Sequence, residues 1–176
     1  QGAVAAITVQ ADANLLPLLE TVVEGRRLVL RWQRGTSIRT KVKALVTVTA
    51  VKLTGLEVRG SGDLAGEGLR SPGLAVRVSG SGALRLSDLV ADELSVSVHG
   101  SGDVLASGSA TRLAISIAGS GDVKTRGLKA EVVSVRIAGS GDADVQAQRT
   151  LDVAIAGSGD VVYSGAATVK KVIAGS

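Results

Sequence analysis

From Leu53 onward, apolar and polar residues alternate in short runs that recur every 18 to 20 residues. The positions between the apolar residues hold Arg, Ser, Ala, Asp and His. Alternation with a period of two is typical of a strand with one buried face, and it keeps one register here through six units. The runs are Leu56-x-Val58, Leu74-x-Val76-x-Val78, Leu94-x-Val96-x-Val98, Leu113-x-Ile115-x-Ile117, Val133-x-Val135-x-Ile137 and Leu151-x-Val153-x-Ile155.

Each alternating run leads into the sequence Gly-Ser-Gly-Asp, or into its variant Gly-Ser-Gly-Ala at Gly80–Ala83. A second short apolar run follows, and a third apolar point comes a few residues later. One such unit cannot bury its apolar face alone, whereas stacked units can. The pattern predicts an all-β, right-handed parallel β-solenoid with about three short strands per coil. A β-propeller is the structural alternative, but its blades need roughly 40 to 50 residues.

The first 52 residues do not repeat. We expect one domain over residues 1–176, with less regular strands and a hairpin in 1–52 and regular coils in 53–176. Pro17 restricts the leucine cluster around it to a short turn. The other expected elements are a strand at Ile7–Ala11, a turn at 12–14, a hairpin of Thr21–Val23 and Leu28–Trp32 around Glu24–Arg27, a polar loop at 33–37 and a strand at Val42–Val51.

The composition limits which residues can form the core and which partners the chain can bind. The chain lacks Phe, Met and Cys and has one Trp and one Tyr, so its interior consists of Val, Leu, Ile and Ala. The net charge is +4, the basic residues are scattered, and aromatic side chains for base stacking are missing, which argues against nucleic-acid binding. No stretch approaches the roughly 18 to 20 apolar residues of a membrane span.

The glycines of the repeated motif predict sharp corners, because glycine accepts positive φ at no steric cost. Ser and Asp side chains at such corners can bond nearby backbone N–H groups. The predicted corner residues are Gly60, Gly62, Gly80, Gly82, Gly100, Gly102, Gly119, Gly121, Gly139, Gly141, Gly157 and Gly159.

Stacking places the motif aspartates in one column, about 4.8 Å apart. Neighbouring carboxylates at that spacing repel by roughly 1 kcal/mol in water, so backbone donors, solvent, basic side chains or a cation must offset the repulsion. Calcium takes six to eight oxygen ligands, and one Asp per coil supplies few. We expect no cofactor and no metal, with calcium as the weaker alternative. Its candidate ligands are Asp63, Asp103, Asp122, Asp142 and Asp160.

Candidate catalytic residues are few. His99 is the single histidine, and it precedes a corner in a column otherwise filled by Arg, Ser and Ala. Carboxylates outside the corners form no recurring group, and Trp32 is either a packing residue or a surface platform for sugars. We therefore expect no enzymatic activity. A carbohydrate-binding or carbohydrate-active β-helix, which needs clustered carboxylates in a cleft, stays as an alternative.

Several parts of the sequence together resemble a bacterial family. They are Asn14–Thr21, Gly25–Leu30, and Leu53–Val58 followed by serial Gly-Ser-Gly-Asp. The family is described as "putative auto-transporter adhesin, head GIN domain". The resemblance implies a right-handed three-sided β-solenoid, export to the periplasm or cell surface, and no established catalytic residues. The expected function is a structural or adhesive surface module whose partners are surface glycans or proteins.

The resemblance also implies that the domain extends past both Gln1 and Ser176, so we expect the sequence to be cut at both ends. A chain whose leader has been removed would begin in this way. An uncapped solenoid exposes strand edges that recruit other chains. The sequence therefore supports a further hypothesis, self-assembly through the solenoid ends into a filament or oligomer.

Overall fold

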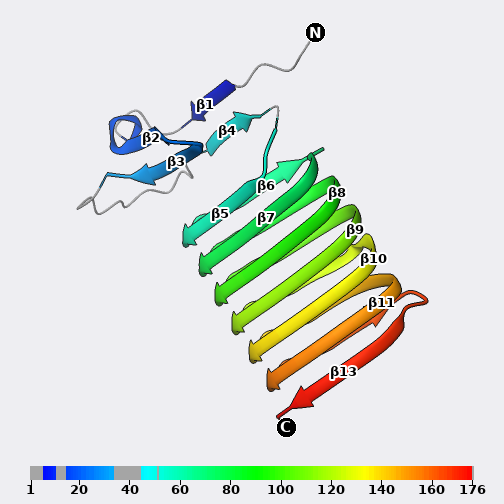
Figure 1. The fold of residues 1–176 in the computed structure, drawn as a ribbon. Helices are drawn as coiled ribbons and strands as arrows, with labels where there is room; N and C mark the ends of the chain where they lie inside the picture. The colour runs from blue at the N-terminus through cyan, green and yellow to red at the C-terminus, as the bar shows by residue number, and fades with distance from the viewer. Residues whose placement is uncertain (1–5, 11–14, 34–44, 51, 176) are drawn as a thin grey trace. The chain divides into compact units, whose positions relative to one another are not determined.

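The computed structural model describes residues 6–10, 15–33, 45–50 and 52–175. Its contacts divide the chain into two compact units, residues 1–51 and 52–176 (Figure 1). This boundary falls next to the change from irregular to repetitive sequence. That both units form one domain, and that the domain is cut at its ends, stay predictions.

The first unit contains two antiparallel strand pairs. Strand β1 (Ala6–Gln10) pairs with β4 (Leu45–Thr49), and β2 (Leu19–Glu24) pairs with β3 (Arg27–Trp32). A 3-10 turn, η1 (Leu16–Leu18), precedes β2 and has Pro17 near its start, where proline's missing N–H costs nothing.

These elements confirm the predicted first strand, short turn and hairpin. The hairpin loop is tighter than predicted, because Glu24 and Arg27 pair with each other and only Gly25, with φ +64°, and Arg26 form the turn. The predicted turn at 12–14, most of the loop at 33–37, and residues 42–44 and 51 of the predicted strand lie outside the described residues.

The second unit is a parallel β-solenoid of about six turns, which confirms the predicted fold class. Every strand pair in it is parallel, and each strand lies beside its equivalent in the next coil (Figure 1). The strands are β5 (Gly55–Gly60), β6 (Leu64–Glu67), β7 (Arg70–Gly80), β8 (Ala83–Gly100), β9 (Asp103–Gly119), β10 (Val123–Gly139), β11 (Ala143–Gly157), β12 (Val161–Ser164) and β13 (Thr168–Ala174).

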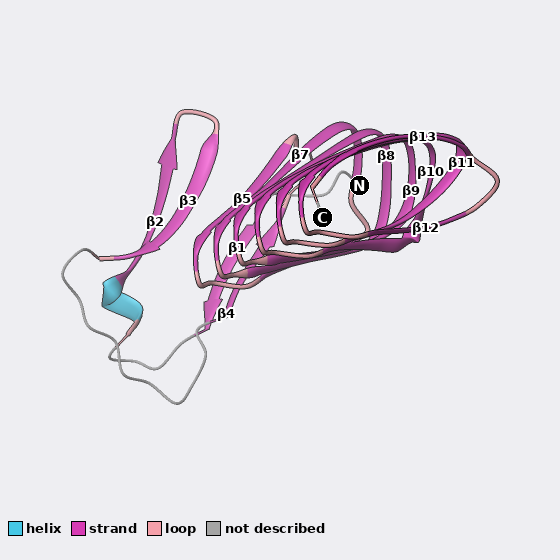
Figure 2. Ribbon diagram, turned by 90° about the horizontal axis from the view of Figure 1, so that it is seen from below, coloured by secondary structure: helices cyan, strands magenta, loops and turns pink. Residues whose placement is uncertain are grey.

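In the central coils the three short strands predicted for each unit join into one long strand that bends. Strand β8 runs for 18 residues, and two exposed pairs, Ser87-Asp88 and Asp92-Glu93, interrupt its inward–outward alternation. Asp88 adopts φ +52°, the left-handed conformation that Gly68 has one coil earlier. The sequence predicted the straight segments correctly, but hydrogen bonding to the neighbouring coils continues through the bends. Figure 2 shows the coils as flattened loops lying one behind another.

The core consists of columns of like side chains, one from each coil. Val76, Val96, Ile115, Val135 and Val153 pair in register, and all are buried. Full burial of each such side chain contributes about 1.5 to 3 kcal/mol. The interior therefore repeats along the stack, as the alternation predicted.

Thr125 is the one fully buried polar side chain among the described residues. Its hydroxyl donates a 3.1 Å hydrogen bond to the backbone carbonyl of Asp144 in the next coil, which satisfies the donor.

Candidate functional site: the corners and the outer faces

The first glycine of each corner has a conformation that other residues rarely adopt. Its φ is +127° at Gly80, +118° at Gly100 and +138° at Gly157. A Cβ on these residues would also collide with the backbone of the corner beneath. Positive φ and close stacking therefore both require glycine at this position.

The second glycine of each corner does not have positive φ. Glycine is required there because the coils approach each other closely. A Cβ on Gly121 would collide with the carbonyl oxygen of Gly102 and would lie 2.8 Å from Cγ1 of Val98. A Cβ on Gly62, in the first corner, would meet no atom within 4 Å. The second glycine is therefore needed wherever a corner stacks on an earlier one.

The aspartates form a hydrogen-bonded column from corner to corner. Oδ1 of Asp103 accepts from the backbone N–H of Asp122 at 3.2 Å, Oδ1 of Asp122 from that of Asp142 at 3.3 Å, and Oδ1 of Asp142 from that of Asp160 at 2.8 Å. Oδ1 of Asp63 likewise accepts from the N–H of Ala83 at 3.1 Å. Each carboxylate thus receives a backbone donor from the next coil, which offsets part of the repulsion along the column.

Neighbouring side chains add little to this arrangement. Lys124 Nζ lies 3.4 Å from Oδ2 of Asp122, in an exposed ion pair. Among the residues that the structure describes, no group of three or more His, Cys, Asp or Glu side chains could hold a metal ion. Whether calcium binds the column stays a hypothesis.

The two residues considered for chemistry belong to different units. His99 is exposed at the end of β8, with Nδ1 3.4 Å from the hydroxyl of Ser97 on the same strand. Trp32 ends β3 with 37% of its surface exposed. The structure gives His99 no acidic hydrogen-bond partner among the described residues.

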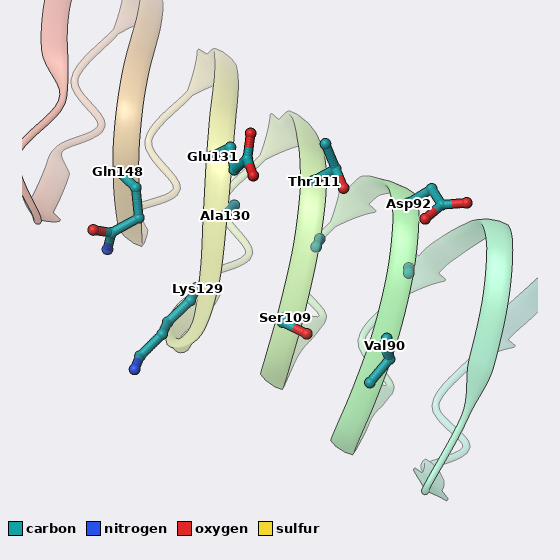
Figure 3. A pocket seen from close by; sticks show the side chains of 10 residues that line it. Val90, Asp92, Ser109, Thr111, Lys129, Ala130, Glu131 and Gln148 are labelled. Atoms are coloured by element: carbon teal, nitrogen blue, oxygen red, sulfur yellow. The ribbon is translucent and has the colours of Figure 1, made fainter.

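A shallow groove of about 320 Å³ crosses β8 to β11 where the coils bend; we call it the edge groove. Buried alanines form its floor, and side chains from successive strands, polar except for Val90, form its margins (Figure 3). Figure 3 shows Asp92, Thr111 and Glu131 along one margin and Val90, Ser109 and Lys129 along the other. The groove thus presents hydrogen-bond donors and acceptors from successive coils.

Exposed ion pairs border the edge groove. Arg149 Nη1 lies 3.3 Å from Glu131 Oε2, and Arg112 Nη2 lies 3.9 Å from Glu93 Oε2. Both pairs are largely exposed, so each contributes between about 0 and 1 kcal/mol to stability. The carboxylates of these pairs are partly neutralised by the arginines. Catalytic carboxylates must be gathered around one point, and these are not.

The outer side of the strand segments that lead into the corners is here called the broad face. It comprises the outward side chains of residues 55–59, 75–79, 95–99, 114–118, 134–138, 152–156 and 170–174. Ala, Ser and Gly fill most of its positions, and β9 presents only Ala114, Ser116 and Ala118. A partner can therefore approach the sheet closely over several coils.

Two arginines project from the centre of the broad face. Arg77, Ser97, Ser116 and Arg136 lie in one column, on four consecutive strands. Arg136 borders a shallow depression of about 370 Å³, together with small residues that include Ser116, Ala138 and Ala156. Neither arginine forms an ion pair with a described residue.

Other charged residues on the broad face differ from these two arginines in their partners or their column. Glu57 neighbours Arg77 in its column, but Arg59 binds it with Nε 2.8 Å from Oε1. That hydrogen bond and charge pairing raise the pKa of Arg59 above its ordinary value. Asp152 lies on β11 and forms no ion pair with Arg136.

These features define a repetitive, parallel β-solenoid with rigid corners and a smooth outer face. The family model described as "putative auto-transporter adhesin, head GIN domain" matches residues 1–167, and the chain belongs to this family. The resemblance seen in the sequence is thereby confirmed.

The chain is similar to several solved structures, three of which are from Bacteroides fragilis and Parabacteroides distasonis. One is described as a putative adhesin from Bacteroides fragilis, with 26% identity, a TM-score of 0.87, and coverage of 96% of this chain and 79% of that chain. Another, from Parabacteroides distasonis, is described as a putative lipid binding protein, with 27% identity, a TM-score of 0.73, and coverage of 97% and 81%. A putative adhesin from the same organism has 25% identity, a TM-score of 0.77, and coverage of 98% and 82%. No curated protein matches the chain significantly.

The edge groove and the broad face were not identified from the sequence. The sequence did show that Arg, Ser, Ala, Asp and His occupy the outward positions. Aligning those positions by coil would have revealed the small-residue columns and the shared column of Arg77 and Arg136. The edge groove depends on the bends within each coil, which carry no repeated motif.

Proposed function

We propose that this chain is a non-enzymatic, extracytoplasmic adhesion-type module that docks on its target through the broad face. The observation that carries the proposal is the rigid in-register ladder beneath that face. Parallel pairing runs from β5 to β13, and columns of buried side chains lie beneath β7 to β11. The family membership and the adhesin descriptions of two similar structures support the same function.

A non-enzymatic role is supported by the separation of the reactive groups. His99 is exposed, and among the described residues its one side-chain hydrogen-bond partner is the hydroxyl of Ser97 on its own strand, so no described acid orients it as a general base. The carboxylates at the edge groove lie on two strands, β8 and β10, and two of them already pair with arginines. Among the described residues no helix is long and apolar enough to cross a membrane.

A second candidate function is glycan binding in the edge groove. Its support is the row of hydroxyl, carboxylate and ammonium groups that successive coils place along the groove. Sugar hydroxyls both donate and accept hydrogen bonds, so such a row is chemically suited to them. The lipid-binding description of one similar structure suggests a third class of ligand, for which the broad face offers few large apolar side chains.

The test is adhesion of beads coated with the chain to an array of bacterial and mammalian glycans and matrix proteins. Ala138→Gln adds bulk to the broad face, and Thr111→Gln adds similar bulk beside the edge groove. Loss of adhesion with Ala138→Gln alone supports docking through the broad face. Loss with Thr111→Gln alone supports the second candidate, and adhesion to no surface would contradict both.

A further inference from the structure

We propose that the broad face binds an acidic polysaccharide, with Arg136 and Arg77 holding carboxylates of one extended chain. The inference rests on the proposed adhesive function and names its ligand class. It depends on three observations: two arginines without ion pairs to described residues, their common column, and the small side chains around them.

The arginines supply the charge complementarity. A guanidinium presents its donors in a planar fork that matches a carboxylate bidentately. Arg70 and Arg85 form no ion pair with a described residue, whereas Arg59, Arg112, Arg126 and Arg149 each form one. Arg77 and Arg136 have no such partner among the described residues, so both can accept an external anion without breaking an existing pair.

The column determines the shape of the ligand. Three strand spacings of about 4.8 Å separate Arg77 from Arg136, so their backbones lie about 14 Å apart along the stacking direction. Ser97 and Ser116 fill the two positions between them and add hydroxyl groups to the same line. A linear polymer along the column can meet both arginines and both serines at once.

The small neighbours favour a thin polymer over a membrane. Ala138, Ala154 and Ala156 surround Arg136 and leave it standing above a shallow floor. Surfaces that bind membranes insert large apolar side chains among the lipid headgroups. On the broad face only Val172, on the last strand, is of that kind.

The experiment measures binding of polygalacturonate fragments to the whole chain by isothermal titration calorimetry, with dextran of similar length as the neutral probe. Arg136→Ser and Arg77→Ser place in the column the residue that Ser97 and Ser116 already supply there, so the fold should persist. Arg112→Ser removes the same charge beside the edge groove and is the matched control. Thermal melts verify that each variant folds.

We expect polygalacturonate to bind and dextran not to bind, with a roughly tenfold or greater loss of affinity in Arg136→Ser, as for a lost charge-assisted hydrogen bond. Arg136→Lys should recover part of the loss, because it keeps the charge without the fork. Arg112→Ser should bind as the unchanged chain does.

Equal losses in Arg136→Ser and Arg112→Ser would overturn the proposal, because binding would then follow net charge alone. Arginine-dependent binding to phosphatidylglycerol vesicles or to an acidic protein, without binding to polygalacturonate, would overturn it in favour of that partner. Adhesion to the array that polygalacturonate fails to inhibit would contradict the ligand class alone. Absence of adhesion to every surface would contradict the proposed function itself.

Discussion

Oδ1 of Asp142 accepts a hydrogen bond of 2.8 Å from the backbone N–H of Asp160, its equivalent in the next coil. The same relationship joins Asp103 to Asp122 and Asp122 to Asp142. Asp103, Asp122 and Asp142 therefore each serve the coil after their own, and the column gains stability from stacking. An isolated unit would have no such bond.

Asp142→Ala should lower the free energy of unfolding by about 1 kcal/mol, because the N–H of Asp160 loses its acceptor at a partly solvated corner. Asp142→Asn keeps an acceptor oxygen and should lose less. Asp152→Ala removes a carboxylate from the broad face that forms no hydrogen bond or ion pair with a described residue, and it serves as the control. Urea unfolding measures all three, and equal effects of Asp142→Ala and Asp152→Ala would contradict the role of the bond.

Ala83 interrupts the aspartate column, since it offers no side-chain acceptor to the N–H of Asp103. Ala83→Asp should add that bond and stabilise the chain by up to about 1 kcal/mol, reduced by repulsion from Asp63 and Asp103. Ala83→Asn adds an acceptor without a charge and should stabilise at least as much at low salt. Thermal melts at low and high salt separate the two effects, and a melting temperature lowered by both substitutions would argue against an available donor.

The two corner glycines Gly62 and Gly121 occupy the same motif position but have different surroundings. A methyl group on Gly121 would overlap Gly102, whereas one on Gly62 points into open space. Gly121→Ala should therefore cost several kcal/mol or prevent folding, and Gly62→Ala should change the free energy of unfolding by no more than about 0.5 kcal/mol. Circular dichroism during urea unfolding checks both. Similar losses at both positions would mean that stacking is not the reason for the second glycine.

The sequence was sufficient to predict the fold because each level of pattern agreed with the others. Val96 and its equivalents recur in one register, so a single arrangement buries all of them. The corner glycines recur with them. The sequence could not show that the segments of a coil form one bent strand. Asp88 adopts the left-handed conformation at a bend, and no repeated glycine motif marks that position.

The candidate surfaces were harder to predict because outward positions vary without affecting the core. Arg77 and Arg136 are 59 residues apart in the chain and become related only when three strand pairings set the register. The Asp142–Asp160 bond is similarly non-local. Sequence spacing indicated a column of aspartates, but the direction of each side chain, toward the N–H of the next corner, came from the structure.

Calcium should not change the stability of the chain. Oδ1 of Asp103, Asp122 and Asp142 already accepts a backbone hydrogen bond, and calcium requires six to eight oxygens. The melting temperature should therefore be the same in a chelator and in millimolar calcium, with magnesium as the control ion. A melting temperature that rises with calcium concentration, as ligand linkage requires for a bound ion, would establish a calcium ladder instead.

Lys171 and Lys170 are neighbours on β13 but belong to opposite sides of the sheet. Lys171 pairs with buried Val153 and so occupies an inward column, whereas Lys170 pairs with exposed Asp152. A charged residue at an inward edge position discourages pairing with another chain. Its stem can cover the apolar core while its ammonium group stays in water.

Lys171→Val should therefore promote self-association of the chain through the outer edge of β13, since it completes an apolar column beside the exposed Ile173. Lys170→Val changes the same charge on the outward side and should leave association unchanged. Sedimentation velocity over a wide concentration range measures both variants. If the unchanged chain already forms concentration-dependent polymers, Lys171 does not protect the edge and the filament hypothesis gains support. If Lys171→Val sediments as the unchanged chain does, the inward lysine is not what limits assembly.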